Sequence, residues 1–303
     1  MTLVQPDLTG SVSKMLKHPE HIAVMQGGAT WPLHVSYCLT SRCQLHCEFC
    51  CLGWNDRKTD LGWDVFAESI TLFANHGAGA VQLSGGEPLL WPYFDEAVRL
   101  CVQKGLAVGV QTNGMNIEAH AESLALAEWV RVGVYSKKQL DGLRLDLLNP
   151  SVPTQLTTVW HNDQTEEFIL ACRTAALANG CEAVRVMADN HCPASPVMGI
   201  GRAVCNRIGH PVQFVQRNGH AAASCWQAWW KVAVDWNGWL YPCGCFSDEQ
   251  TRRKRRICHV RDASEFYAKP PADMGHRCMP CLYAEQNALL DQAMQPVRHG
   301  RFL

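Results

Sequence analysis

Residues 43–50 read CQLHCEFC and place Cys43, Cys47 and Cys50 at C-x3-C-x2-C spacing. Three thiolates in one short loop can hold three corners of a 4Fe–4S cluster, because soft sulfur ligands suit iron–sulfur clusters. A missing fourth ligand would leave one iron open to a substrate. Cys51 directly follows Cys50, and adjacent side chains usually point apart, so we expect no role for it. A zinc knuckle is the alternative interpretation of this spacing.

The bulk composition is that of a globular protein, with 303 residues, 47% of them hydrophobic and 18% charged. This length allows one large α/β domain, or a large and a small one, around a buried core. The net charge of −1 gives no general attraction to nucleic acid or to an acidic membrane surface. The first residues show no secretory signal, and no segment reaches the roughly 18 apolar residues of a membrane span. We therefore expect a cytoplasmic protein without a nucleic-acid or membrane partner.

Sixteen cysteines are many for such a chain. A disulfide framework is disfavoured, because the cytosol keeps thiols reduced and the chain can build a core without cross-links. The remaining uses are metal ligands, catalytic thiols and small buried apolar residues. The spacing of the cysteines must distinguish among these uses.

Three apolar segments surround the first cysteine group. WPLHVSYCLT (31–40) predicts a strand that leads into the cysteine loop. AVQLSGGEPLLW (80–91) predicts a strand that ends in two glycines and Glu87. Glycines let the backbone approach a ligand closely, and Glu87 adds a carboxylate beside them. LAVGVQTNG (106–114) predicts a further strand followed by a turn.

This order of signals resembles the radical S-adenosylmethionine (SAM) superfamily. The resemblance implies that Cys43, Cys47 and Cys50 bind the cluster, whose open iron takes the amino and carboxylate groups of SAM. Reduction of the cluster would cleave SAM to a 5′-deoxyadenosyl radical, which abstracts a hydrogen atom. The other implied SAM contacts are Phe49 with the adenine, Gly85, Gly86 and Glu87 with the methionine amino group, and Ser136 with the ribose. A carboxylate pairs well with a partly buried ammonium, whereas Ser136 can equally be a solvated strand end.

Strand and helix patterns alternate along the chain, which predicts a parallel sheet with helical crossovers. The resemblance implies an α/β fold, a partial (β/α)6 barrel with its active site at the C-terminal ends of the strands. We divide the chain into an N-terminal extension (1–30), the barrel (31–212) and a small C-terminal auxiliary-cluster domain of β-hairpin and helix (213–303). The expected strands are 33–39, 80–84, 106–111, 130–135, 155–160 and 183–188, and the expected helices are 63–76, 93–104, 118–128 and 164–178.

A second cysteine group follows in the C-terminal part. Residues 225–243 read CWQAWWKVAVDWNGWLYPC, and Asn237-Gly238 predicts a hairpin with a type I′ turn. Antiparallel pairing would bring together Cys225 and Cys243 at the outer ends of the hairpin. Cys278 and Cys281 form a C-x2-C pair further on, so four thiolates from a hairpin and a loop can close a site completely. A structural four-cysteine zinc site is the alternative.

This group resembles the auxiliary-cluster region, called twitch or SPASM, of some radical SAM enzymes. The larger version continues with further cysteines, whereas this chain has Asn287 and Asp291 at the onward positions. The resemblance therefore implies one auxiliary 4Fe–4S cluster, with Cys258 as an alternative to one of the ligands. The expected ligands are Cys225, Cys243, Cys278 and Cys281.

Cys245 lies two residues after Cys243, in YPCGCF (241–246). A protonated thiol can give a hydrogen atom to a carbon radical. If the adenosyl radical removes hydrogen from one face of a carbon and Cys245 returns it to the other, the stereocentre inverts. An apolar setting keeps the thiol protonated, and the auxiliary cluster could help to reduce the thiyl radical. The alternative is a spare buried cysteine, as we expect for Cys101, Cys172 and Cys181.

The layout is similar to that of radical SAM epimerases of aminoglycoside biosynthesis, which invert C5‴ of neomycin C to give neomycin B. The resemblance implies a small-molecule aminoglycoside substrate and an external electron donor such as flavodoxin or ferredoxin. A polyamine sugar needs carboxylates and flat apolar faces. The candidates for these contacts, most of them expected to be ordinary core or surface residues, are Trp54, Trp91, Trp160, Trp226, Asp146, Asp189, Asp248 and Glu249.

Four other functions compete with this interpretation. One is dehydrogenation of a sugar or cyclitol alcohol, in which Cys245 is idle, and another is epimerisation or cross-linking of a peptide. RNA modification is suggested by RRKRR (252–256), although such runs are usually solvated. The non-enzymatic alternative is an iron–sulfur electron carrier, against which the intact GGEP segment argues.

Overall fold

The computed structural model describes residues 12–52, 55–161, 163–189, 196–215, 221–244, 248–278 and 281–295. The described strands form one sheet, in the order β7-β6-β5-β4-β3-β2-β1-β8-β9. Neighbouring strands from β1 to β7 pair in parallel. The strands are β1 (His34–Cys38), β2 (Ala80–Ser84), β3 (Ala107–Thr112), β4 (Trp129–Gly133), β5 (Thr154–Trp160), β6 (Ala183–Ala188), β7 (Val212–Val215), β8 (Lys231–Val234) and β9 (Leu240–Tyr241).

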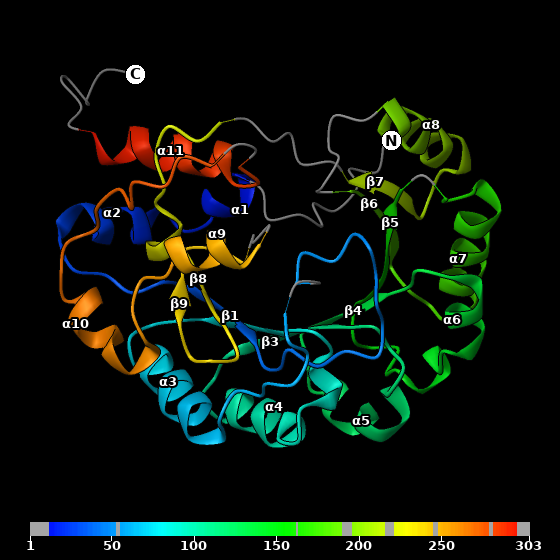
Figure 1. Cartoon of the computed structure of the whole chain (residues 1–303), viewed down its shortest axis with the longest axis horizontal. Helices are drawn as coiled ribbons and strands as arrows, with labels where there is room; N and C mark the ends of the chain where they lie inside the picture. Colours follow the sequence, from blue (N-terminus) through cyan, green and yellow to red (C-terminus); the bar gives the residue numbers. More distant parts are fainter. Residues whose placement is uncertain are drawn as a thin grey trace.

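Helices connect the parallel strands and lie outside the curved sheet, as Figure 1 shows for α3 to α8. A tight turn cannot join two parallel strands, because the chain must first return to the end of the sheet where the next strand begins. A helix provides this return. The predicted α/β class with a parallel sheet is thus confirmed. The α-helices are α1 (Val12–Met15), α2 (Pro19–Gly27), α3 (Trp63–Asn75), α4 (Phe94–Gln103), α5 (Ile117–Leu124), α6 (Lys137–Gly142), α7 (Glu166–Ala178), α8 (Pro196–Ile208), α9 (Glu249–Lys254), α10 (Ala263–Tyr267) and α11 (Ala284–Met294). Short 3-10 helices are η1 (Pro88–Leu90), η2 (Leu145–Leu147), η3 (Gln227–Trp229) and η4 (Val260–Asp262).

The two faces of the sheet differ in what covers them. Tyr37 of β1 points to the helix side, where its ring lies 4.9 Å from that of Phe66 and its hydroxyl is 2.8 Å from Ser69 Oγ. Side chains alternate along a strand, so Ser36 and its neighbours in register point the other way. We call the face that is turned away from α3 to α8 the inner face. The outer face holds the apolar core, and the inner face is available for a site.

The hairpin of β8 and β9 extends the same sheet instead of forming a separate layer. β8 pairs in parallel with β1, and β9 pairs antiparallel with β8. Residues 213–303 therefore contribute directly to the sheet of the barrel. β7 and this hairpin belong to one sheet, which therefore continues across residue 212. The proposed domain boundaries remain a prediction.

The predicted type I′ turn at Asn237-Gly238 is wrong. A type I′ turn needs a positive φ at both central residues. Gly238 has one, of 76°, but Asn237 does not, because Arg57 is the only described non-glycine residue with a positive φ. Asp235 accepts a hydrogen bond from the Gly238 N–H (2.9 Å) and donates its own N–H to Trp239 (3.0 Å). This is a three-residue loop with glycine in the left-handed position. The Asp235 carboxylate favours it by accepting hydrogen bonds from the backbone of Asn237 and Trp239.

Several elements were not predicted from the sequence. β7 adds a seventh parallel strand, but it has only four residues, too few for a clear alternation. Glycines at two positions weaken the helical signal of α8. Residues 12–30 form α1 and α2 and contact the C-terminal part, where His21 Nε2 lies 2.8 Å from the Trp229 carbonyl and Gln26 donates to the Ala293 carbonyl.

The basic run at 252–256 was expected to be solvated, yet Arg252 is buried. Its guanidinium pairs with the buried carboxylate of Asp235. Arg253 pairs with Glu249, and the Arg256 guanidinium lies 4.1 Å from the centre of the Trp239 ring. The contacts of Arg252 and Arg256 hold α9 and the residues after it against the hairpin. In the part of the chain that is described, no helix combines the length and apolar character that crossing a membrane requires.

The buried pair gives a first testable prediction. Asp235→Ala leaves the Arg252 guanidinium without its buried partner and should lower the free energy of unfolding by about 3–5 kcal/mol. Glu249→Ala removes an exposed pair from the same helix and should change it by less than about 1 kcal/mol. Urea unfolding of both variants measures the difference. Equal stability of the two variants would contradict the role of Asp235.

Candidate functional site

The loop that carries the first cysteine group is closed at its base by Asp60. Thr40 and Asp60 form an isolated antiparallel bridge, and the Thr40 hydroxyl donates to Asp60 Oδ1 at 2.5 Å. Arg42 holds the same carboxylate with two hydrogen bonds of 2.9 and 2.8 Å. The Ser41 N–H donates to the Thr59 carbonyl at 2.8 Å. Residues 41–60 therefore form a loop whose two ends are held together directly after β1.

The two glycines after β2 clamp this loop through the backbone. The N–H of Gly86 donates to the Thr40 carbonyl at 2.8 Å, and that of Glu87 donates to the Arg42 carbonyl at 2.7 Å. A Cβ on Gly86 would lie 2.2 Å from the Arg42 carbonyl oxygen, and one on Gly85, at φ +143°, would lie 2.6 Å from that of Thr40. Only glycine allows this approach.

The Glu87 side chain is 0% exposed. It has a structural role that was not predicted from the sequence. Its carboxylate accepts hydrogen bonds from the Asn113 N–H (2.5 Å), the Thr112 hydroxyl (2.5 Å) and the Leu89 N–H (3.1 Å). Burial raises the pKa of Glu87 to about 7, although these hydrogen bonds act in the opposite direction. Glu87 thus ties the end of β2 to the end of β3. Its predicted contact with the SAM amino group remains a prediction.

The structure brings Cys43, Cys47 and Cys50 together. Burial, and then the charges of Cys50 and Cys43, raise the pKa of Cys47 to about 11. Cys43 Sγ accepts hydrogen bonds from the Leu45 N–H (3.4 Å) and from Asn113 Nδ2 (3.9 Å). Asn113 belongs to the QTNG segment, so all three sequence signals meet at one place.

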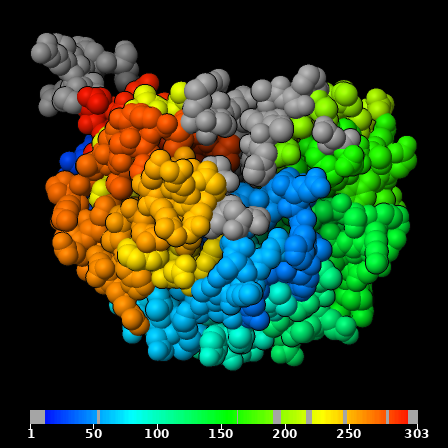
Figure 2. Space-filling view, in the orientation of Figure 1, coloured from blue at the N-terminus to red at the C-terminus, as the bar shows by residue number. Residues whose placement is uncertain are grey.

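The same loop packs against the C-terminal hairpin. Cys38, Cys50 and Cys51 contact an apolar cluster made of Leu52, Ala233, Trp236 and Tyr241. Figure 2 shows the blue segment on the viewed face, between the yellow-orange C-terminal part and the green half of the barrel. Burial, followed by the charges of Cys50 and Cys38, raises the pKa of Cys51 to about 12. Cys51 was expected to have no role, and its contacts here are those of a packing residue.

Phe49 extends from the loop towards the ends of β4 and β5. Its ring centre lies 5.0 Å from that of Tyr135 and 5.4 Å from that of His161, with which it stacks. Ser136, the candidate ribose contact, caps α6 by accepting a hydrogen bond from the Gln139 N–H at 3.2 Å. The structure thus gives Ser136 a structural role.

The four cysteines of the second group also lie together. Burial raises the pKa of Cys225 to about 12, with smaller contributions from the charges of Cys243, Cys278 and Cys281. Cys258 is not part of this group, since the charges that act on it are those of Asp262, Glu265 and Lys269. Within the described residues, no set of three or more His, Cys, Asp or Glu side chains has an arrangement that could hold a metal ion.

Asn287 and Asp291, which replace cysteines of the larger pattern, hold the segment around Cys225. Asn287 Oδ1 accepts a hydrogen bond from the Trp226 N–H at 2.9 Å, and its Nδ2 donates to Cys281 Sγ at 3.7 Å. Asp291 accepts a hydrogen bond from the Trp226 indole at 3.4 Å. These residues of α11 act as a scaffold for the thiols.

Most of the candidates for aminoglycoside contacts have other roles in the structure. Trp91, Trp160 and Trp226 are buried in the core. Asp146 and Glu249 form exposed pairs with arginines, and Asp248 caps α9. Trp54 and Cys245 lie outside the described residues.

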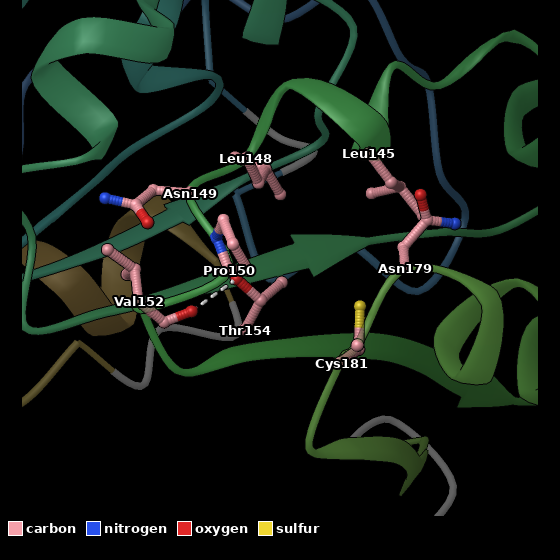
Figure 3. A pocket seen from close by; sticks show the side chains of 9 residues that line it. Leu145, Leu148, Asn149, Pro150, Val152, Thr154, Asn179 and Cys181 are labelled. Carbon is pink, nitrogen blue, oxygen red and sulfur yellow. Dashed lines mark hydrogen bonds between the residues drawn. The ribbon is translucent and has the colours of Figure 1, made fainter.

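A small hollow lies at the opposite end of the sheet and is unrelated to the thiols. Figure 3 shows its lining, where the Thr154 hydroxyl donates to the Val152 carbonyl at 3.1 Å. Thr154 begins β5, and Cys181 precedes β6. In a parallel sheet these positions belong to the N-terminal edge, away from the loops that carry the site.

Comparison with known proteins identifies the domain. Residues 37–136 match the Radical SAM superfamily, so the chain contains a radical SAM domain. The GTP 3′,8-cyclase of Mycolicibacterium smegmatis is 28% identical over 213 residues, which cover 66% of this chain and 54% of that protein. The probable GTP 3′,8-cyclase of Methanocella arvoryzae is 37% identical over 100 residues, 32% of this chain and 31% of that protein. The matched parts thus span about a third to a half of these relatives.

Solved structures share the fold at low sequence identity. Streptococcus suis SuiB, bound to precursor peptide SuiA, has a TM-score of 0.62 at 14% identity and covers 87% of this chain and 71% of its own. The enzyme anSMEcpe, with bound AdoMet and a peptide, has a TM-score of 0.58 at 14% identity, over 90% of this chain and 86% of its own. At these identities the likeness shows the fold alone.

The clamp at Gly86 can be tested by adding one methyl group. Gly86→Ala should lower the free energy of unfolding by about 1–3 kcal/mol, because the Cβ collides with the Arg42 carbonyl. It should also speed protease cleavage within residues 41–60. Gly79→Ala is the matched control, since a Cβ there meets nothing within 4 Å. Equal effects of the two substitutions would contradict the clamp.

Proposed function

We propose that this radical SAM enzyme holds two 4Fe–4S clusters and removes a hydrogen atom from a small molecule. Cys43, Cys47 and Cys50 would bind the first cluster. The observation that carries the proposal is the clamped loop, in which these thiols meet the GGEP and QTNG segments at the C-terminal ends of β1 to β3. The ligands expected for the auxiliary cluster are Cys225, Cys243, Cys278 and Cys281.

The donor chemistry is compatible with iron–sulfur clusters. Both groups consist of soft sulfur ligands, which bind iron in such clusters, and a four-cysteine zinc site remains the alternative for the second group. The first group has three thiols, so a fourth position would stay open for SAM. The bound cluster and SAM together supply a 5′-deoxyadenosyl radical. An external donor such as flavodoxin or ferredoxin would provide the electron.

The residues around the first group would position SAM. Phe49, which stacks on His161 and lies tilted against Tyr135, would offer an aromatic surface for the adenine. Because the Glu87 carboxylate is buried against its own chain, we assign the methionine amino group to the half-buried backbone of Gly85 and Gly86. Glu87 then acts by holding that backbone in place.

Cys245 is the proposed hydrogen donor of an epimerase. After a hydrogen atom is removed from one face of a substrate carbon, the Cys245 S–H bond would break to return a hydrogen atom to the other face. One electron and one proton then restore the thiol. Support comes from the position of Cys245 two residues after Cys243, a member of the second thiol group. Dehydrogenation, in which Cys245 is idle, is the alternative.

Neomycin C is the candidate substrate that the resemblance suggested, but the described residues do not favour it. A polyamine needs carboxylates, and three of the four carboxylates considered for it, Asp146, Glu249 and Asp248, pair with arginines or cap a helix. We therefore keep epimerisation as the proposed reaction and leave the aminoglycoside as a compound to be screened.

Iron analysis tests the two clusters. Anaerobically reconstituted protein should hold about eight iron atoms, and about four after Cys43, Cys47 and Cys50 are all changed to Ala. Cys225→Ala with Cys243→Ala should also leave about four. Only the first set should abolish the formation of 5′-deoxyadenosine from SAM and dithionite. Cys172→Ala, in the core of α7, is the control and should retain both properties. Full iron content in either set of variants would contradict the assignment.

Turnover in heavy water tests Cys245. Compounds that raise 5′-deoxyadenosine formation are first identified, neomycin C among those screened. Epimerisation predicts a product of unchanged formula with one solvent deuterium, and Cys245→Ala should stall it while Cys172→Ala does not. A product lighter by two hydrogens would mean dehydrogenation and would remove the role of Cys245.

A further inference from the structure

Asn113 lies where the cysteine loop meets the ends of β2, β3 and β4. It directly follows β3 and is 6% exposed. Its N–H donates to Glu87 Oε2 at 2.5 Å, and its carbonyl accepts a hydrogen bond from Gln139 Nε2 at 2.8 Å. The same Gln139 amide donates to the Gly133 carbonyl at the end of β4. The backbone of Asn113 is therefore fixed from both sides, so its side chain has a defined starting point.

The orientation of the Asn113 side-chain amide is set by a backbone donor. The Met115 N–H donates to Asn113 Oδ1 at 3.0 Å. A backbone N–H can only donate, so the atom that it meets must be the amide oxygen. The NH2 group is thereby turned to the other side of the amide, towards the cysteine loop.

This NH2 group donates to two residues at the start of the cysteine loop. Asn113 Nδ2 lies 2.9 Å from Gln44 Oε1 and 3.9 Å from Cys43 Sγ. Gln44 donates from its own Nε2 to Asn116 Oδ1 at 3.3 Å, so its oxygen is the atom that faces Asn113. The Leu45 N–H reaches the same sulfur at 3.4 Å. Cys43 thus receives one N–H donor from the backbone and one from a side chain.

These two donors favour the negatively charged form of the Cys43 sulfur. Burial raises the pKa of the Cys43 thiol, the Leu45 N–H lowers it, the charge of Glu87 raises it, and the Asn113 amide lowers it. The amide therefore opposes both burial and the neighbouring carboxylate. A sulfur that is bound to iron is a thiolate, so the same donor stabilises its charge.

We propose that Asn113 raises the reduction potential of the first cluster by donating a hydrogen bond to the sulfur of Cys43. Reduction by one electron adds a negative charge to a group that already includes three thiolates. Hydrogen bonds to the sulfurs stabilise this charge and are among the factors that set the potential. The electron comes from the external one-electron donor, and Asn113 keeps its protons. The inference rests on the proposed function, because it concerns the control of the same cluster.

Asn113 and Glu87 act on the sulfur of Cys43 in opposite directions. The charge of Glu87 disfavours further negative charge at this sulfur, whereas the Asn113 amide favours it through a direct hydrogen bond. Because Glu87 also holds the Asn113 N–H, the amide cannot leave the sulfur without strain on a buried hydrogen bond. Leaving a buried carboxylate without its donor is costly. The clamp that positions the loop therefore also keeps the donor in place while the cluster is reduced.

The test is a redox titration followed by electron paramagnetic resonance. It uses protein with Cys225→Ala and Cys243→Ala, which lacks ligands expected for the auxiliary cluster. Asn113→Leu in this background removes the donor and keeps a branched side chain of similar shape. The ratio of reduced to oxidised cluster at a fixed potential should fall by up to about tenfold, which is about 59 mV for one electron.

A second variant separates the hydrogen bond from the shape of the turn. Asn113→Asp keeps the oxygen that accepts from the Met115 N–H but replaces the donor by a negative charge. Its potential should therefore fall further than that of Asn113→Leu. Asn116→Ala is the control, since it removes an amide of the same turn that bonds to Gln44 instead of to a thiol. Its potential should be unchanged.

Iron content, measured first, separates the two levels of the argument. If the protein with Asn113 intact holds no cluster in the first group, the proposed function fails. If iron is retained and all variants have equal potentials, or Asn113→Asp has the higher one, only the role of Asn113 is overturned. A variant that loses iron is replaced by a measurement on intact Asn113. Protein with 15N in its asparagine side chains should show a 15N coupling to the reduced first cluster in pulsed spectra, and its absence would overturn the proposal.

Discussion

The backbone clamp between the GGEP segment and the start of the cysteine loop is the constraint on which the site depends. Two hydrogen bonds, from Gly86 to Thr40 and from Glu87 to Arg42, fix the loop at the end of β1. The buried Glu87 carboxylate extends the clamp to β3 through Asn113. One short segment thus joins three neighbouring strand ends. Cys43 directly follows Arg42, so the clamp also fixes where the Cys43 thiol lies.

The hairpin at the other edge of β1 links the two thiol groups. Tyr241 packs near Cys50 and Cys51, and Cys243 follows two residues later. The turn of that hairpin depends on Asp235, which binds its own backbone and the Arg252 guanidinium. A basic run that suggests nucleic-acid binding in the sequence is thereby used in part to support the fold.

The sequence predicted what depends on spacing and alternation. The cysteine triplet, GGEP and QTNG lie at strand ends, and six of the parallel strands appear close to their expected residues, as with β2 and β6. It could not predict what depends on register. Arg131, Arg185 and Lys231 are far apart in the chain, and only strand pairing turns them to one face. The stacking of His161 on Phe49 needs tertiary contact, and the hairpin turn was missed because Asp235, not Asn237, determines it.

Binding of SAM at the first thiol group is tested most directly by electron paramagnetic resonance. The Cys225→Ala, Cys243→Ala variant removes ligands expected for the auxiliary cluster, so the spectrum of the reduced protein reports the first cluster. The account predicts that SAM shifts the g values of this spectrum, because an iron with no protein ligand is open to the amino and carboxylate groups of SAM. A spectrum that is identical with and without SAM would mean a fully ligated cluster and an electron carrier instead of a radical SAM enzyme.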